Sequence, residues 1–202
     1  LNHVREVQII MNNLTKNALE ESLKKFLLHK PLDKITISDL TDDCGISRMA
    51  FYYHFKDIYD LVEWACIEDA TRALQGKKTY DTWQDGLLQI FEAVLENKPF
   101  ILNVYRSVSR ERMENYLYSL IYQLIEGVVE EKSVNMKVSA EQKKFIADFY
   151  KYSFVGVMLD WVKRGMKETP REMAGLISIT MQGNIGNSLQ NMEKSPEYRE
   201  HR

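Results

Sequence analysis

Apolar residues recur along most of this chain at the three- and four-residue spacing of an amphipathic helix. The first such stripe starts at Leu14 and ends at Pro31, whereas residues 1–11 show no periodicity and are interpreted as an N-terminal arm. No segment alternates apolar and polar residues convincingly enough to indicate a strand. Nine glycines and four prolines in 202 residues leave few positions that would interrupt long helices. The pattern therefore predicts an all-α protein.

Two short helices joined by a tight turn are predicted between residues 36 and 56. Thr36 precedes an apolar stripe as an N-cap residue, and Asp39 stands three positions later, as in a capping box. Gly45 follows as the residue that permits a positive φ at the end of a helix, and Ser47 caps the next one. Two short helices around a glycine-containing turn, followed by a third helix, are typical of a helix-turn-helix.

The second of these short helices has the composition of a recognition helix. Phe51 and Phe55 lie four residues apart, so they share the face that would pack on the core. Arg48 stands at the start of the helix, where an arginine can pair with a guanine edge in the major groove. Tyr52 and His54 can donate hydrogen bonds to phosphates. The alternative is that this aromatic cluster is simply part of the core.

Longer helices are expected in the rest of the chain. The pattern predicts them over about 57–76, 83–95, 99–106, 109–131, 139–164 and 170–192, which brings the total to about nine helices. The change in helix length near Gly76 indicates a boundary. The predicted organisation is an arm and helix-turn-helix domain over 1–56, a connecting helix over 57–76, and a C-terminal helical domain over 77–202.

Charge and cysteine content narrow the class of protein only a little. The formal net charge is −2, so any attraction to nucleic acid must come from the local placement of basic residues. Cys44 and Cys66 lack the spacing of metal ligands and are expected to be reduced, as in a cytoplasmic protein. No stretch resembles a signal peptide, and the longest uncharged run, 175–192, contains too many amides for a membrane span.

The run from Ile35 to Asp57 resembles the signature of the TetR family of bacterial transcriptional regulators. The similarity covers roughly residues 14–67, and the segments 58–64 and 154–161 are similar to a subgroup related to DhaS, a regulator of dihydroxyacetone kinase genes. The resemblance implies a homodimer that binds a palindromic operator in double-stranded DNA. It also implies control by an unidentified small-molecule effector or by a partner protein, and it leaves repression and activation both open.

The resemblance further implies which positions contact DNA, although Met49 and Ala50 replace the family's common glycine and threonine, which shifts the expected readout toward apolar contact. These positions are Thr36, Ser47, Arg48, Met49, Ala50, Tyr52, Tyr53, His54 and Lys56. Two departures weaken the expected hold on phosphate. Ile58 stands where relatives commonly carry a lysine, and the acidic Asp42 and Asp43 end the first helix of the motif. We therefore expect modest affinity for DNA and a steep dependence on salt.

For the C-terminal part, the resemblance implies a dimer interface on the last two long helices and an effector pocket among aromatic residues. The small residues that would allow close approach of helices are Gly156, Gly175, Ser178, Gly183 and Gly186. The residues expected to line a pocket are Trp83, Phe91, Phe100, Asn103, Arg106, Tyr116, Tyr152 and Asp160. The alternative for the aromatic residues is that they only fill the core.

Two other classes of function were weighed against a DNA-binding regulator. The same helices with a vestigial helix-turn-helix would serve as a protein-interaction module or co-regulator. An enzyme is not expected, because no GxGxxG, HExxH, GxSxG, phosphate-binding loop or paired-carboxylate metal spacing occurs. The sequence therefore predicts no catalytic residue, no metal site, no cofactor and no membrane partner.

Overall fold

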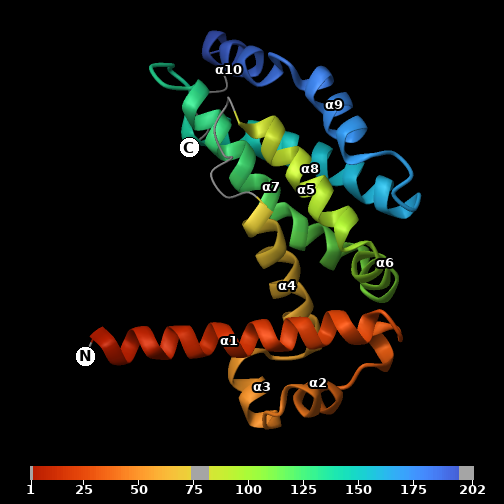
Figure 1. Cartoon of the computed structure of the whole chain (residues 1–202). Coiled ribbons are helices and arrows are strands. Elements are labelled where there is room, and N and C mark those ends of the chain that lie inside the picture. The colour runs from red at the N-terminus through yellow and green to blue at the C-terminus, as the bar shows by residue number, and fades with distance from the viewer. Residues whose placement is uncertain (1, 74–81, 196–202) are drawn as a thin grey trace. The chain divides into compact units, whose positions relative to one another are not determined.

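The computed structural model describes residues 2–73 and 82–195, with side chains from residue 12 onward except at residues 70 and 73. Within these ranges all regular secondary structure is helical, which confirms the all-α prediction (Figure 1). Contacts divide the chain into two compact units. Unit 1 comprises Leu1–Glu68 and Lys98–Ser109, and unit 2 comprises Asp69–Asn97 and Arg110–Arg202. No helix in the described ranges is long and apolar enough to cross a membrane.

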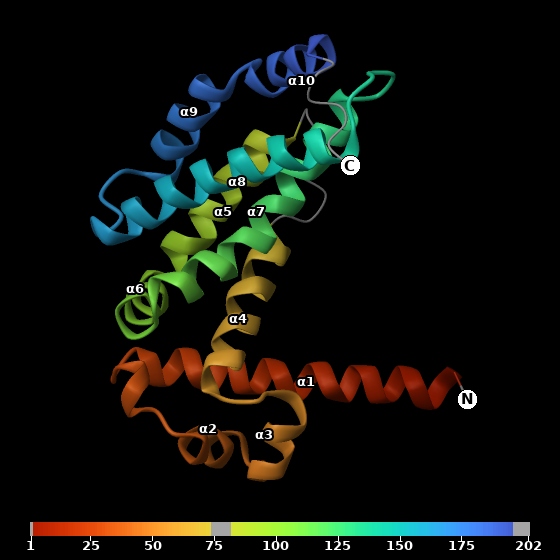
Figure 2. The ribbon, with the colours of Figure 1, turned by 180° about the vertical axis from the view of Figure 1, so that it is seen from behind.

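Unit 1 is built around a long first helix. Its elements are α1 (Asn2–Leu27), the 3-10 turn η1 (Leu32–Lys34), α2 (Ile37–Cys44), α3 (Arg48–His54), the first part of α4 (Ile58–Ala73) and α6 (Lys98–Ser107). In both views α2 and α3 lie together along α1 (Figure 2). Leu19, Leu23, Leu40 and Leu61 are fully buried in the core of this unit.

Helix α1 begins earlier than its apolar stripe indicates. It starts at Asn2, so residues 2–11, interpreted as an N-terminal arm, continue the first helix. The physical reason is that neither glycine nor proline occurs before Pro31, so nothing interrupts the helix once it has formed. Apolar periodicity indicates which face of a helix is buried, so it cannot detect a helical segment that has no buried face.

Helix α6 packs with unit 1 although the chain on both sides of it belongs to unit 2. The predicted division placed this segment in the domain over 77–202, whereas its contacts are with α1 and η1. The side chain of Asn103 makes the closest connection. Its Oδ1 accepts from the N–H of Leu32 at 3.1 Å, and its Nδ2 donates to the carbonyl oxygens of Leu27 and Lys30, each at 3.2 Å. Asn103, expected in a pocket, thus secures the turn that follows α1.

Unit 2 contains α5 (Trp83–Glu96), α7 (Arg110–Lys132), α8 (Ala140–Lys163), α9 (Pro170–Met181) and α10 (Asn184–Lys194). Helices α7 and α8 pack along each other, α10 touches both, and α9 packs on α5 (Figure 1). Phe91 and Trp161, both fully buried, meet edge to face with ring centres 5.0 Å apart. The indole N–H of Trp161 donates to the carbonyl of Glu168 at 3.0 Å, so this buried polar group is satisfied.

The segment 170–192, predicted as one helix, is interrupted at Gln182 and Gly183. Helix α9 begins as expected, with Thr169 as N-cap in a capping box and Pro170 in its first turn. Gln182 has ψ 118°, which ends α9, and Gly183 has φ 77°, a left-handed value that favours glycine, before α10 begins. The sequence reading assigned Gly183 to helix packing, whereas the structure uses it to redirect the chain.

Replacing Asn103 by alanine is expected to lower the free energy of unfolding by about 1–3 kcal/mol, because the N–H of Leu32 and two carbonyls lose a part-buried partner. Urea denaturation followed by circular dichroism measures this change. Arg106→Ala, at an exposed position of the same helix, is the control and should stay close to wild type. Equal midpoints for the two variants would contradict the role assigned to Asn103.

Candidate nucleic-acid interface

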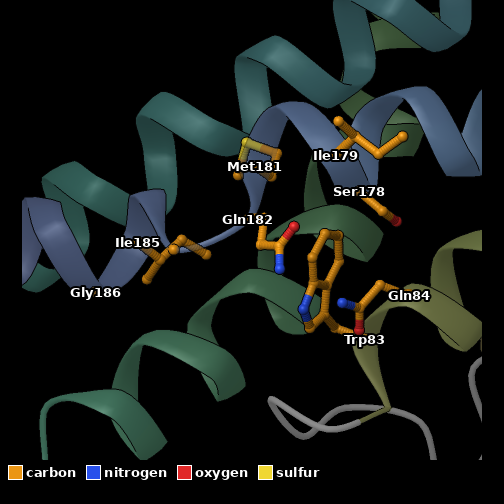
Figure 3. A pocket seen from close by; sticks show the side chains of 9 residues that line it. Trp83, Gln84, Ser178, Ile179, Met181, Gln182, Ile185 and Gly186 are labelled. Carbon is orange, nitrogen blue, oxygen red and sulfur yellow. The ribbon is translucent and has the colours of Figure 1, made fainter.

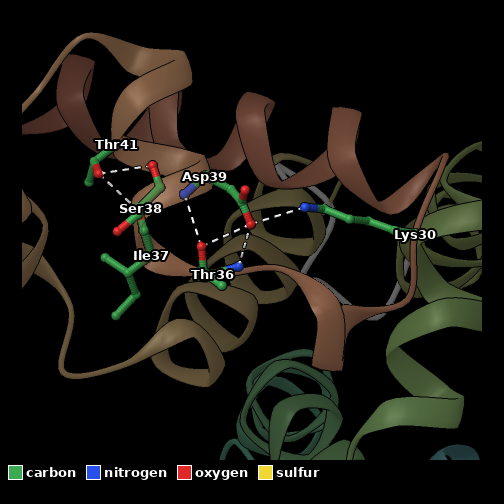
Figure 4. A network of polar contacts seen from close by, with 6 residues as sticks. All are labelled: Lys30, Thr36, Ile37, Ser38, Asp39 and Thr41. Atoms are coloured by element: carbon green, nitrogen blue, oxygen red, sulfur yellow. Dashed lines mark hydrogen bonds and ion pairs between the residues drawn. The ribbon is translucent and has the colours of Figure 1, made fainter.

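The first turn of α2 is held by a network of short-range hydrogen bonds (Figure 4). The N–H of Asp39 donates to Thr36 Oγ1 at 3.1 Å, and the N–H of Thr36 donates to Asp39 Oδ2 at 2.7 Å. Lys30 Nζ reaches the same carboxylate oxygen at 3.0 Å. This confirms the predicted capping box and adds a lysine that precedes the helix. The network fixes where α2 starts.

The carboxylate of Asp39 is held in its charged form by this network. The hydrogen bond from the backbone of Thr36, followed by that from Lys30, lowers the pKa of Asp39 from 3.8 to about 2. The side chain of Asp39 therefore stays ionised at every physiological pH. Its charge is paired with Lys30, so it adds little net negative charge to this surface.

The turn between α2 and α3 has the geometry that the sequence predicts. Gly45 has φ 66°, and its N–H donates to the carbonyl of Asp42 at 3.2 Å. The N–H of Ile46 then donates to the carbonyl of Thr41 at 2.9 Å. Ser47 Oγ accepts from the N–H of Ala50 at 3.1 Å and caps α3. Because both ends of the turn are capped, α3 has a fixed starting direction.

Helix α3 presents two chemically different faces. Phe51 and Phe55 are buried, with ring centres 5.8 Å apart, and Phe55 lies 5.8 Å from the ring of Trp64 on α4. The opposite side is in solvent: Met49 is 77%, Tyr53 68% and Tyr52 47% exposed. A helix of seven residues is too short to hold its orientation alone, so these aromatic contacts determine which residues face outward.

The residues predicted to contact DNA are mostly exposed on or beside α3. Two of them, Ala50 and His54, are half-buried. Those in solvent are Thr36, Ser47, Arg48, Met49, Tyr52, Tyr53 and Lys56. We use the name "α3 surface" below for Arg48, Met49, Tyr52 and Tyr53, which are the exposed residues of the helix itself.

Nearby charges set the electrostatics of this region. Burial, and to a lesser degree the charge of Lys16, lowers the pKa of His54, so its imidazole is neutral at pH 7. Lys25 forms an ion pair with Asp43 and lowers the pKa of that carboxyl group, so one of the two predicted repulsive acids is compensated. Sequence reasoning missed Lys16 and Lys25 here, because both lie on α1 and reach these partners only through the fold.

The predicted departure at Ile58 is present in the structure. Ile58 is half-buried in the first turn of α4, where it offers no charge to a phosphate. Asp57 caps this helix as predicted, since its Oδ1 accepts from the N–H groups of Tyr59 and Asp60, each at 2.9 Å. The N–H of Lys56 donates to Asp60, and the Lys56 side chain is exposed. Lys56 is therefore the basic side chain closest in sequence to the end of α3.

The eight residues predicted to line an effector pocket are divided between the two units. Phe100, Asn103 and Arg106 belong to α6 in unit 1, and the other five belong to unit 2. Phe91 and Tyr116 are buried in the core, whereas Tyr152 and Asp160 are exposed. Trp83 alone of the eight lines a cavity where α9 meets α10, and Asp160 lies on a groove between α8 and α9.

The small residues predicted at a dimer interface have different surroundings. Ser178, Gly183 and Gly186 line the cavity beside Trp83, and Gly156 is exposed on the groove between α8 and α9. A Cβ atom added to Gly156, Gly175 or Gly186 would have no neighbour within 4 Å. No packing within the described chain therefore requires glycine at these three positions.

Sequence reasoning missed a row of exposed apolar side chains on unit 2. They are Phe145, Phe149, Tyr152 and Val157 on α8, and Leu176 and Ile179 on α9. We call this row the α8–α9 face. The helical spacing of its α8 members is visible in the sequence, but periodicity alone cannot tell a core stripe from an exposed one.

The C-terminal part of the chain matches a family model described as "Transcriptional regulator C-terminal region" of the TetR type over residues 81–183, which is half of the chain. The chain belongs to the TetR family of transcriptional regulators. This confirms the predicted family, and the match lies C-terminal to residues 35–57, which carry the resemblance.

Individual relatives agree with this assignment. The chain is 21% identical to the HTH-type dhaKLM operon transcriptional activator DhaS of Lactococcus lactis, over 75% of this chain and 81% of that protein. The structure of a dihydroxyacetone kinase operon activator DhaS superposes with a TM-score of 0.62 at 19% identity and covers 89% of this chain and 96% of its own. The structure of NalD of Pseudomonas aeruginosa, a secondary repressor, superposes with a TM-score of 0.55 at 15% identity. The match covers 84% of this chain and 96% of NalD. The fold thus serves an activator and a repressor alike.

The capping box of α2 leads to a prediction about acid stability. The folded-state pKa of Asp39 is about 2 and its ordinary value is 3.8, so its stabilising effect is complete above about pH 4 and is lost as the pH falls toward 2. Asp39→Asn should therefore flatten the fall in Tm over this range. Thermal melts followed by circular dichroism measure this slope between pH 6 and pH 2, a range that includes both pKa values. Asp33→Asn, on the neighbouring η1 turn, is the control, and an unchanged slope for Asp39→Asn would refute the prediction.

Proposed function

We propose that this regulator acts as a homodimer on a palindromic operator and reads DNA sequence with the α3 surface in the major groove. The observation that carries the proposal is the two-faced α3 helix. Phe51 and Phe55 are buried on one side, so the polar and apolar tips of Arg48, Met49 and Tyr52 are held outward. A recognition helix needs this arrangement, because its base-reading side chains must project from a rigid support.

Each residue of the α3 surface has a contact that suits its chemistry. The guanidinium of Arg48 can pair with the O6 and N7 atoms of guanine, and the apolar tip of Met49 suits a thymine methyl group. The hydroxyl groups of Tyr52 and Tyr53 suit phosphate oxygens. Ser47 accepts a hydrogen bond from Ala50, which leaves its hydroxyl hydrogen for a phosphate.

The second copy of the chain would bind at the α8–α9 face. Six large apolar side chains exposed on two helices are unusual for a monomer, because their burial lowers the free energy. Between α8 and α9 lies a groove of about 550 Å³, lined in part by Val157, Leu176 and Ile177. In a two-fold dimer the same face of each chain meets its counterpart, so side chains of one copy can enter the groove of the other. Such symmetry would place two α3 helices about 34 Å apart on DNA.

Control by an effector or a partner protein is the third part of the proposal. Helix α6 follows α5 and precedes α7 in the chain, yet it packs on α1 and η1. A rearrangement of α5 or α7 would therefore pull on a helix that is bonded through Asn103 to the turn before α2. Coupling of this kind needs two states with different positions of α6.

The alternative function is a protein-interaction module with little affinity for DNA. Two observations favour it: Ile58 replaces an expected lysine, and Lys25 is already paired with Asp43. Both reduce the positive charge available for phosphates. Direct measurement of DNA binding separates the two functions.

Arg48→Ala and Tyr52→Ala are each expected to weaken binding to the DNA upstream of the protein's own gene. A lost base contact costs about 1–3 kcal/mol, so the Kd should rise by about tenfold or more for Arg48→Ala. Fluorescence anisotropy of labelled DNA at fixed salt measures this. Arg171→Ala, an exposed arginine of α9, is the matched control and should bind normally. No binding by wild type, or equal binding by Arg48→Ala, would favour the interaction module.

Introducing a charge into the α8–α9 face should separate the dimer. Leu176→Glu would bury a carboxylate against apolar side chains of the second copy, so light scattering after size exclusion should give half the wild-type mass. Val134→Glu is the matched control, because Val134 is as exposed as Leu176 (65% and 63%) but lies outside this face. A wild-type monomer, or a Leu176→Glu dimer, would refute this interface.

A further inference from the structure

A small cavity lies in unit 2 where α9 gives way to α10, against the start of α5 (Figure 3). Its volume is about 240 Å³. Trp83 and Gln84 line it from α5, Ser178 from α9, and Gln182 and Ile185 from the break and the first turn of α10. The break at Gly183 creates this space, because a continuous helix would carry the chain straight past Trp83.

The side chain of Trp83 is almost wholly buried, and its indole N–H has no hydrogen-bond partner among the described residues. It is 4% exposed and packs on Phe154 with ring centres 6.3 Å apart. Within the described residues its indole N–H makes no hydrogen bond, whereas the N–H of Trp161 donates to the carbonyl of Glu168. Among the described residues, the fully enclosed side-chain atoms without a partner belong to Ser22, Gln142 and Glu168, so the N–H of Trp83 keeps access to the space of the cavity. An acceptor placed in this cavity would satisfy the N–H of Trp83.

The remaining polar groups of the cavity are uncharged. Figure 3 shows the carboxamides of Gln84 and Gln182 on either side of the indole ring, with the hydroxyl of Ser178 above. A carboxamide can both donate and accept, so these groups can satisfy either kind of polar atom. Among the residues that the structure describes, no lysine, arginine, aspartate or glutamate lines the cavity. A charged occupant would lose part of its hydration without a counter-ion from these residues, so this lining favours a neutral one.

Packing does not explain why the cavity stays open. A Cβ atom at Gly186, one of the lining residues, would meet no heavy atom within 4 Å. A larger residue would therefore fit at that position and reduce the space. At roughly 30 Å³ per water molecule, 240 Å³ holds about eight water-sized groups. This matches a compact molecule of about one ring with a short polar substituent.

We propose that this cavity is a binding site for a compact neutral molecule with an apolar body and a hydrogen-bond acceptor. The acceptor takes the N–H of Trp83, the body lies against the indole ring and Ile185, and Gln182 closes the polar side. Ile179 lines the cavity and also belongs to the α8–α9 face, so a bound molecule that moves its side chain would change that face. Its role as an effector site rests on the proposed regulator function, whereas binding itself does not.

Nuclear magnetic resonance of the ¹⁵N-labelled full chain tests the site, because its three tryptophans give three indole N–H signals. The probes are benzamide, benzoate and benzamidine, which share a shape and differ in charge. Benzamide should shift the Trp83 signal saturably in the millimolar range and leave those of Trp64 and Trp161 in place. Benzoate and benzamidine should bind at least about tenfold more weakly than benzamide, because their unpaired charge would lose hydration in the cavity. Trp83→Phe identifies the signal.

Gln182→Ala should weaken benzamide binding about fivefold, as expected for one lost hydrogen bond between neutral groups. Gln190→Ala, an exposed glutamine of α10 outside the cavity, is the matched control and should bind as wild type. No saturable shift of Trp83, equal binding of the three probes, or an unchanged affinity in Gln182→Ala would each overturn the site. Arg48→Ala should still bind benzamide. A loss of DNA binding and a loss of benzamide binding are therefore distinguishable results.

Discussion

The burial of Phe51 and Phe55 is the constraint on which the proposed role of α3 in reading DNA depends. Helix α3 has only seven residues and gains little stability from its own hydrogen bonds. Its orientation comes from these two rings, from Trp64 beneath Phe55, and from the Ser47 cap. Loss of either ring would leave Arg48 and Tyr52 in place along the chain but without a fixed direction toward DNA.

Charge around this helix is arranged so that acids and lysines neutralise each other. Asp39 is paired with Lys30, and Asp43 with Lys25, so two carboxylates near the helix-turn-helix contribute structure without strong repulsion of phosphate. The same pairing occupies two lysines that would otherwise attract DNA. Such a surface relies on the geometry of a few contacts, and less on a general positive field.

The break between α9 and α10 gives unit 2 two features at once. Leu176 and Ile179 are exposed on α9, which ends at the break, and Gln182 and Gly183 at the break line the cavity beside Trp83. Ile179 takes part in both. A molecule in the cavity and a second copy on the α8–α9 face would therefore share a wall, which is a direct physical route from binding to assembly.

The sequence alone determined the features that arise from residues three or four positions apart. The Thr36 and Ser47 caps, the left-handed Gly45 and the inward Phe51 and Phe55 follow from such local geometry, and so does most of the helical layout. Tertiary structure decided the rest. The amphipathic pattern of α6 shows that one of its faces is buried, but not which unit buries it. Packing decides for unit 1, where Asn103 bonds to Leu32 in a turn 71 residues earlier in the chain. Contacts between distant segments likewise decide the Lys25–Asp43 pair, the break at Gly183 and the residues that surround Trp83. Periodicity does not encode such contacts.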